Sequence, residues 1–211
     1  MREGDIVTEK GANWEGSLGL RVDSGLAVSN RHVLPDVGAR VVHRVKPWVD
    51  ITEIGTVIKV SQWRSPSILD WIIYIFTGKP PPANKTDASL IRLDSDVKVG
   101  RFKEITGMAE PVKGLKTYKR GRTTGETEGE ILEESVTIRV DMGEGRQMIF
   151  TDVFMFSNQT LPGDSGGPIV CVTEKGYVGV GITFAGPESG RYGFGIKILN
   201  ILKEFGVGQS V

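Results

Sequence analysis

The sequence predicts an all-β protein made of two tandem six-stranded antiparallel β-barrels with a C-terminal helix. Apolar side chains recur mostly at every second position, which is the period of a strand with one buried face. The 28 glycines among 211 residues indicate many tight turns, because glycine adopts positive φ angles without steric cost. About a dozen short candidate strands are spread over the whole chain, whereas one six-stranded barrel would use only half of it.

Three segments show the clearest alternation of apolar and polar positions. These are residues 39–45, 53–60 and 131–142, and only Glu134 interrupts the apolar face of the last one. The remaining candidates are apolar runs bounded by turn signals such as PDVG, MGEGR and PESG. They comprise residues 17–22, 25–30, 88–93, 115–120, 146–156, 168–172, 177–185 and 192–198.

The strand candidates divide into two groups of similar size. We expect an N-terminal barrel over residues 1–103 and a C-terminal barrel over residues 104–211, because residues 94–111 resemble a connecting loop. The stretch 62–86 fits neither barrel, since an aromatic-rich apolar patch precedes a proline triplet at residues 80–82. We interpret it as a long insertion with a short helix or hairpin, whose aromatic side chains either cap a barrel end or meet a substrate or partner.

One clear helix is expected near the end of the chain. Its apolar residues follow the i, i+3, i+4, i+7 spacing of one helix face, and a glycine follows as a stop signal. These residues are Ile198, Ile201, Leu202, Phe205 and Gly206. The helix is therefore expected to pack its apolar face against a barrel.

The overall charge gives no indication of a polyanionic partner. The 26 Lys and Arg residues balance the 26 Asp and Glu residues, so neither nucleic acid nor an anionic membrane is expected as a partner. The longest apolar patch, residues 67–76, is too short to span a bilayer and contains Asp70. No metal or other cofactor is expected, since the two histidines and one cysteine lack metal-ligand spacing and no phosphate-binding glycine loop occurs.

The single cysteine limits the covalent chemistry of the chain. Cys171 lies in an apolar run, which favours a small buried side chain over a reactive thiol, and no intrachain disulfide can form. The first residues contain no apolar segment of signal-peptide length. Together these observations predict a cytoplasmic protein, with a mature secreted domain as the alternative.

Only two histidines are candidates for a catalytic base. His32 follows the strand candidate 25–30, where it is either a base presented to a cleft or a capping residue, whereas His43 lies on the apolar face of a strand. A histidine base needs a carboxylate that orients its ring. Asp87 is the candidate, because it directly precedes an apolar strand. The other aspartates considered lie in turns or in the apolar patch: Asp36, Asp70, Asp94 and Asp96.

The stretch PGDSGGP, residues 162–168, contains the candidate nucleophile Ser165. A serine hydroxyl needs a base that takes its proton, and N–H donors for the oxyanion that forms. The N–H groups of Gly163 and Ser165 are the candidate donors, and Asp164 is expected to turn inwards towards a buried partner. The histidine and aspartate candidates lie in the first half of the chain, so the three side chains would meet between the barrels.

Several segments in register resemble the chymotrypsin-like (trypsin-like) serine peptidases. LAVSNRHVL, TDASLIRL and PGDSGGPIV are similar to the histidine, aspartate and serine segments of that family, and KRGRTTGETEGEI resembles a Gly-x-Thr-Thr-Gly stretch of its bacterial members. The resemblance extends to HtrA-type proteases, without a PDZ-like domain. It implies the two-barrel fold and assigns Ser165 as the nucleophile, His32 as the general acid and base, and Asp87 as the group that orients His32.

The resemblance also implies a substrate pocket, walled by the segments VGITFAG and YGFGIKI. The implied residues are Gln159 and Thr160 at the floor, Phe184, Ala185 and Gly186 on one wall, and Gly193 and Phe194 on the other. No carboxylate is expected at the floor, so we expect a small or medium apolar residue before the scissile bond. Digestive relatives pair the acid before the nucleophile with a new amino terminus, and here Arg122 or Arg120 is the expected partner of Asp164.

The leading hypothesis is a serine endopeptidase that hydrolyses a polypeptide substrate through an acyl-enzyme intermediate. Two alternatives differ from it: a self-processing protease with a single partner substrate, and an inactive protease-fold protein that serves as a scaffold or binding module. The combination of His32, Asp87, Ser165 and Gly163 argues against the inactive alternative.

Overall fold

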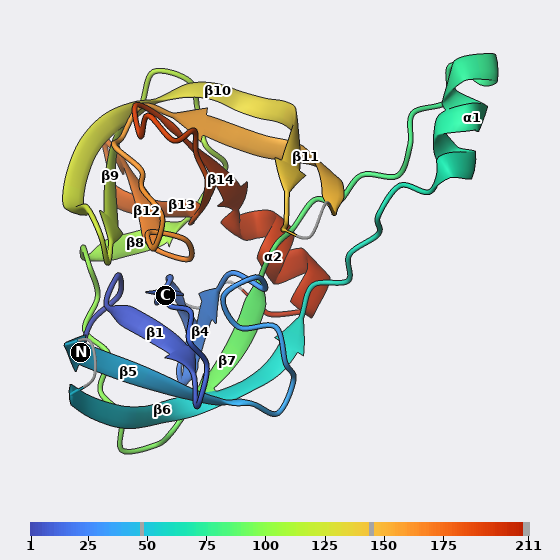
Figure 1. Ribbon diagram of the computed structural model, residues 1–211. Helices are drawn as coiled ribbons and strands as arrows, with labels where there is room; N and C mark the ends of the chain where they lie inside the picture. The colour runs from blue at the N-terminus through green and yellow to red at the C-terminus, as the bar shows by residue number, and fades with distance from the viewer. Residues whose placement is uncertain (47–48, 144–145, 209–211) are drawn as a thin grey trace.

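Among the residues that the structure describes, two β-sheets of seven strands each form the two halves of the protein (Figure 1). The computed structural model describes residues 1–46, 49–143 and 146–208. The strands of the first sheet are β1 (Ile6–Glu9), β2 (Gly16–Ser17), β3 (Arg21–Asp23), β4 (Leu26–Ser29), β5 (Arg40–Lys46), β6 (Val49–Val60) and β7 (Ser89–Leu93). The strands of the second are β8 (Ile105–Met108), β9 (Lys116–Gly121), β10 (Gly125–Asp141), β11 (Gln147–Phe156), β12 (Pro168–Thr173), β13 (Gly176–Ala185) and β14 (Gly193–Lys197). The all-β prediction is therefore confirmed.

The first sheet closes into a barrel through an interrupted strand. β2 pairs with β1 at one end of the sheet, and β3 pairs with β4 at the other end. Between them, the Gly19 N–H donates to the Val28 carbonyl (2.8 Å), and the Val28 N–H donates to the Leu20 carbonyl (3.1 Å). Because β2 and β3 together border both β1 and β4, they act as one bent strand, and the barrel has the six strands that the sequence predicts.

The second sheet closes through β12. This strand pairs antiparallel with both β9 and β13, so a ring of six antiparallel strands forms in the order β9, β10, β11, β14, β13, β12. The seventh strand, β8, lies outside the ring and pairs parallel with β13. β8 falls within residues 94–111, where a loop was expected, and β1 was not among the strand candidates either. Each has four residues, too few for a clear alternation.

The C-terminal helix α2 (Ile198–Phe205) has the buried face that the sequence predicts. Its buried residues are Ile198, Ile201, Leu202 and Phe205. Gly206 ends the helix in the left-handed conformation, with φ at 65°. The buried face joins an apolar cluster that contains Val28 of the first barrel and both Phe150 and Phe184 of the second. One core therefore connects the two barrels and α2, and any site between the barrels has a packed support.

The insertion at residues 62–86 carries the helix α1 (Ile68–Thr77), which projects away from both barrels (Figure 1). Trp63, near the start of the insertion, packs edge-on against Phe150 with ring centroids 6.3 Å apart. The expected capping of a barrel end by aromatic residues is therefore right for Trp63. It is wrong for α1, since none of the residues of that helix is buried.

Candidate active site

His32 and Asp87 come together because their strands pair. β4 ends at Ser29, β7 begins at Ser89, and these two residues are register partners in the antiparallel pair. The residues that follow β4 and those that precede β7 consequently lie side by side at the same end of this strand pair. The His32 N–H donates to Asp87 Oδ1 at 3.1 Å, and His32 Nδ1 is hydrogen-bonded to Asp87 Oδ2. The Asp87 side chain is fully buried, whereas 29% of the His32 side chain is exposed.

The backbone around Asp87 is held in place by neighbouring side chains. The Asn30 amide donates to the Asp87 carbonyl at 2.7 Å, and the next residue, Ala88, donates its N–H to the Ser61 hydroxyl at 3.0 Å. His43, the second histidine, has a different role. Its Nδ1 is hydrogen-bonded to the carbonyl of Ile6 in the neighbouring strand at 2.9 Å. His32 is thus oriented by a buried carboxylate, and His43 connects two strands of the sheet.

Ser17 of the first barrel anchors the loop that carries Ser165. The Ser17 N–H donates to the Ser165 carbonyl (2.8 Å), and the Ser17 hydroxyl donates to the Gly163 carbonyl (2.9 Å). The Ser29 hydroxyl donates in turn to the Ser17 carbonyl at 2.9 Å. This chain of bonds connects the Ser165 loop to the end of β4, three residues before His32.

Two N–H groups of this loop have no acceptor within the described residues, those of Gly163 and Ser165. Their neighbours are paired: the Asp164 N–H donates to the Leu161 carbonyl (3.0 Å), and the Gly166 N–H donates to the Thr183 carbonyl (2.8 Å). Gly163 has φ at 96°, and a Cβ there would lie 2.5 Å from Thr123 Oγ1. Only glycine fits this position, and the loop leaves two adjacent donors free.

Ser165 and His32 share Phe184 as a neighbour. The Phe184 ring lies 6.3 Å from the His32 ring, centroid to centroid, and Phe184 lines the same pocket as Ser165. Within the described part of the chain, the Ser165 hydroxyl makes no hydrogen bond to His32. The fold therefore places Ser165 and the bonded pair of His32 and Asp87 beside the same phenylalanine, without a hydrogen bond between serine and histidine in the described residues.

The pocket beside Ser165 has a volume of about 270 Å³. Its lining residues are Thr160, Leu161, Pro162, Ser165, Phe184, Ala185, Gly186, Pro187 and Glu188. The expected residues Thr160, Phe184, Ala185 and Gly186 are among them. The other expected residues, Gln159, Gly193 and Phe194, do not line this pocket.

The three expected residues outside the lining lie elsewhere, and the ring of Phe194 packs edge-on against Tyr192 with centroids 5.6 Å apart. The side chain of Gln159 is exposed, and Gly193 lies directly behind Thr160, because a Cβ on Gly193 would be 2.6 Å from Thr160 Oγ1. The sequence interpretation missed Leu161, Pro162, Pro187 and Glu188. All four are close in sequence to expected pocket residues, and that proximity was the one available signal.

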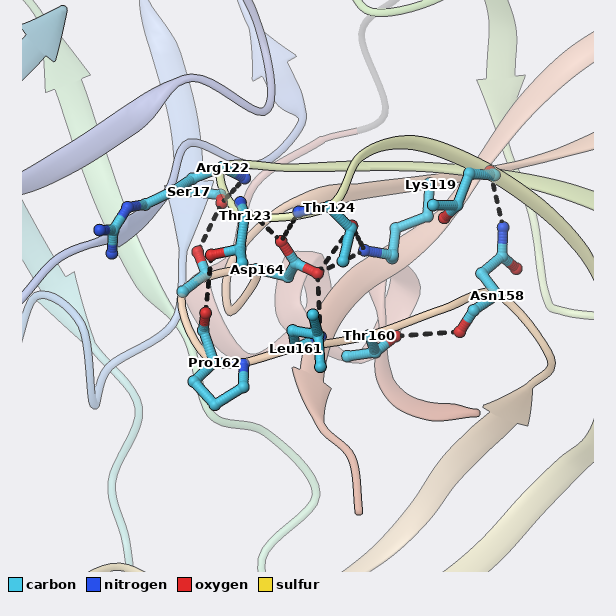
Figure 2. A network of polar contacts seen from close by, with 12 residues as sticks. Ser17, Lys119, Arg122, Thr123, Thr124, Asn158, Thr160, Leu161, Pro162 and Asp164 are labelled. Atoms are coloured by element: carbon cyan, nitrogen blue, oxygen red, sulfur yellow. Dashed lines mark hydrogen bonds and ion pairs between the residues drawn. The ribbon is translucent and has the colours of Figure 1, made fainter. Parts of the chain in front are cut away.

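Asp164 pairs with Lys119, and neither side chain is exposed to solvent (Figure 2). The Lys119 ammonium lies 2.8 Å from Asp164 Oδ2 and also donates to the Thr124 hydroxyl at 2.8 Å. Asp164 Oδ1 accepts the N–H groups of Thr123 (2.9 Å) and Thr124 (3.0 Å). Oδ2 accepts the Leu161 N–H (3.0 Å) and the Thr124 hydroxyl (2.8 Å). Every lone pair of this buried carboxylate is thus engaged.

The expected pairing of Asp164 with Arg120 or Arg122 is wrong. The Arg120 guanidinium binds the Asp5 carboxylate at 2.7 Å, and that of Arg122 binds Glu15 at 2.9 Å. Side chains alternate along β9, so that Lys119 faces inwards while Arg120 faces the other way.

The Gly-x-Thr-Thr-Gly stretch forms the cradle of Asp164. A Cβ on Gly121 would lie 2.4 Å from Asp164 Oδ1, so a side chain there would displace the carboxylate. Thr123 and Thr124 supply three of its hydrogen bonds. Gly125, with φ at 65°, ends the turn and starts β10. The stretch therefore fixes Asp164, and with it the backbone of Ser165.

Burial and pairing act on both charges of this pair. Burial tends to raise the pKa of Asp164, but the Lys119 ammonium and the hydrogen-bond donors outweigh it and hold that pKa below the ordinary value of 3.8. Burial lowers the pKa of the Lys119 ammonium from its ordinary value of 10.5, against the opposing influence of Asp164. The carboxylate is consequently ionised in neutral solution.

Two barrels with a histidine, an aspartate and a serine at their junction are the arrangement expected for a chymotrypsin-like serine peptidase. The trypsin domain family matches residues 13–203, and this chain belongs to that family. No curated protein matches the chain by sequence.

Solved structures of bacterial proteases share the fold over almost the whole chain. Protease A of Thermobifida fusca is 23% identical, with a TM-score of 0.65 over 97% of this chain and 95% of that one. Cellulomonas bogoriensis chymotrypsin is 21% identical, with a TM-score of 0.64 over 99% and 98%. A Nocardiopsis protease is 20% identical, with a TM-score of 0.67 over 97% and 96%. The fold is the chymotrypsin fold.

Proposed function

We propose that this protein is a serine endopeptidase in which His32, Asp87 and Ser165 form the catalytic triad. The observation that carries the proposal is the double contact of the fully buried Asp87 with the N–H and the Nδ1 of His32. A buried carboxylate in this position selects one tautomer of the imidazole and stabilises its protonated form during the reaction. Membership of the trypsin family supports the same function.

The reaction follows from the roles of these groups. As Ser165 Oγ bonds to the carbonyl carbon of the substrate, His32 Nε2 takes the hydroxyl proton. The free N–H groups of Gly163 and Ser165 donate to the oxyanion that forms. The peptide C–N bond then breaks, and His32 returns the proton to the leaving amine. Water, deprotonated by His32, finally attacks the acyl carbon. The ester bond to Ser165 Oγ then breaks, and His32 returns the proton to that oxygen.

The pocket supports cleavage after a small or medium apolar residue. Leu161, Pro162, Phe184 and Ala185 provide apolar walls, and the carboxylate of Glu188 is exposed at the rim. A panel of peptides that vary only before the scissile bond tests this preference. We expect the highest kcat/KM after Ala, Val or Leu, and fastest cleavage after Lys or Arg would contradict the pocket assignment.

Labelling with a fluorophosphonate tests the nucleophile directly. The wild-type protein should be labelled at Ser165, and the Ser165→Ala variant should lose both label and peptide hydrolysis. Ser24→Ala, which removes an exposed turn hydroxyl, should keep both and serves as the control. A folded wild-type protein that takes no label would favour the scaffold alternative. Labelling without hydrolysis of any peptide in the panel would favour the self-processing protease.

A further inference from the structure

Helix α1 exposes most of its apolar side chains. The exposed fractions reach 82% for Ile68, 63% for Leu69, 75% for Ile75 and 82% for Phe76. One side comes near the second barrel, where the Arg139 guanidinium lies 5.2 Å from the centroid of a Trp71 ring. A helix that is mainly apolar is typical of a protein core or of a lipid environment, and the described chain offers α1 no core.

The polar groups of α1 are used within the helix itself. The Ser67 hydroxyl accepts the Asp70 N–H at 3.2 Å, and the Asp70 carboxylate accepts the Ser67 N–H at 2.8 Å, so the two residues form a capping box. At the other end, the Thr77 hydroxyl donates to the Ile73 carbonyl, and Gly78 adopts the left-handed C-cap. Both ends of the helix are therefore capped by residues of the helix or directly beside it.

The two connections to α1 are joined at their base. Asn84 accepts the Arg64 N–H (2.7 Å) through its side-chain oxygen, and its amide donates to the Arg64 carbonyl (3.1 Å). The Asn84 N–H donates to the Ile149 carbonyl, and the Thr151 N–H donates to the Asn84 carbonyl. Both bonds are 2.8 Å long and attach Asn84 to β11. Residues 65–83 thus form a loop that is closed at Asn84 and attached to the second barrel, and α1 is carried at its far end (Figure 1).

The charges near α1 are mainly positive. Arg64, Lys79 and Lys85 are exposed, and in the part of the chain that the structure describes none of them forms an ion pair with a carboxylate. Asp70 is the one acid in residues 62–86, and its carboxylate is engaged in the capping box. The balanced charge of the whole chain therefore conceals a local excess of positive charge around an apolar helix.

We propose that α1 inserts into the interfacial region of an anionic lipid bilayer and holds the two barrels at its surface. Ten helical residues extend about 15 Å, roughly half of the hydrocarbon thickness, so α1 enters one leaflet. No helix among the described residues is long and apolar enough to span a membrane. Trp71 and Tyr74 suit the boundary between headgroups and acyl chains, and the three basic side chains attract anionic headgroups.

Sedimentation with sucrose-loaded vesicles tests the proposal. The full-length protein should bind vesicles of phosphatidylcholine with 30% phosphatidylglycerol and should bind pure phosphatidylcholine more weakly. Ile75→Asp combined with Phe76→Asp should weaken binding at least roughly tenfold, because two exposed apolar side chains no longer enter the lipid. Lys79→Gln and Lys85→Gln should each weaken binding to the anionic vesicles about fivefold, with little effect on neutral ones.

The control variants place a charge on exposed apolar residues away from α1. Val37→Asp and Val112→Asp alter side chains that are 61% and 49% exposed, and both should bind vesicles like the wild type. Equal binding of the α1 double variant and the wild type would overturn the proposal, as would an absence of binding by the wild type. Self-association that the α1 double variant abolishes, without any lipid binding, would also overturn it and would identify a second copy as the occupant of α1.

Discussion

Two fully buried aspartates, one in each barrel, differ in the side chain that each of them contacts. Asp87 contacts His32, of which 29% remains exposed, whereas Asp164 contacts Lys119, which is not exposed at all. Both carboxylates also accept backbone N–H groups. The same side chain therefore occupies two sites of similar burial, and the solvent access of its partner distinguishes them.

The difference separates a reacting group from a supporting one. A histidine that reaches the cleft can exchange a proton with a substrate, so the Asp87 pair is suited to catalysis. A fully buried lysine cannot exchange a proton with a substrate. The Asp164 pair can therefore only hold the backbone next to Asp164 in place. We expect changes at Asp87 to reduce activity with little loss of stability, and changes at the Asp164 site to reduce both.

The largest effect is expected for Asp87→Asn. The amide keeps an acceptor for the His32 N–H but no longer holds the productive tautomer, so kcat should fall about 10⁴-fold. Steady-state hydrolysis of a peptide and thermal unfolding measure the two sides of the comparison. Asp94→Asn, which alters an aspartate paired with Arg40 at the surface, should keep its activity. A loss of less than tenfold for Asp87→Asn would contradict the role given to this pair.

Lys119→Met should give the largest loss of stability. The variant leaves a buried carboxylate without its cation, which typically costs about 3–5 kcal/mol of unfolding free energy. Urea unfolding of the variant and the wild type measures this loss of free energy. Lys116→Met on the same strand removes an exposed ion pair with Glu128 and should change the free energy by less than about 1 kcal/mol. Similar results for the two lysines would show that the buried pair has no special structural role.

Gly121→Ala should have an intermediate effect. The new Cβ would lie 2.4 Å from Asp164 Oδ1, so the cradle must shift, at a cost of about 1–3 kcal/mol. Peptidase activity should fall with stability, because Ser165 follows the displaced residue. Gly107→Ala in β8, where an added Cβ meets nothing within 4 Å, is the matched control. An alanine at 121 that leaves activity unchanged would argue against the cradle as the support of Ser165.

The smallest effect on stability is expected when the pH is lowered. The pKa of Asp164 is lower in the folded protein than its ordinary value of 3.8, so the pair stabilises the fold fully above the unfolded-state pKa. This contribution is lost as the pH falls through the folded-state value. In Lys119→Met the cation is absent and burial raises the pKa of Asp164, so the stability gap to the wild type should narrow as the pH falls from the raised pKa of the variant to the lowered pKa of the wild type. Urea unfolding between pH 2 and pH 7 measures the gap, and a constant gap would contradict this linkage.

The strands and the contact between His32 and Asp87 could be predicted because each has a local signal. Alternating apolar residues mark most strands, and His32 and Asp87 each border an apolar run that fixes their place at a sheet edge. β1 and β8 escaped this approach because four residues show too little of the period. β8 is a strand because it pairs parallel with β13. That strand lies too far along the sequence for a local pattern to reveal the pairing.

The partner of Asp164 and the pocket lining could not be predicted for two different reasons. Lysine and arginine are both rarely buried, so residue type does not distinguish Lys119 from Arg120 and Arg122. The position of Lys119 on the inward face of β9, with Thr117 and Gly121, decides the pairing. The pocket is lined mainly by loops, where no period relates a residue to the direction of its side chain. Gln159 points outwards and Leu161 inwards for reasons that only the path of the loop reveals.

The apolar cluster that joins Val28, Phe150 and α2 makes the two barrels depend on each other thermodynamically. Either half made alone would expose its share of that cluster to water. Heat should consequently melt the protein in one cooperative transition, without a stage in which one barrel stays intact. The residues of the proposed triad come from both barrels, so the proposed site should be lost in the same step. Partial unfolding cannot leave a misassembled cleft with residual, unselective hydrolysis.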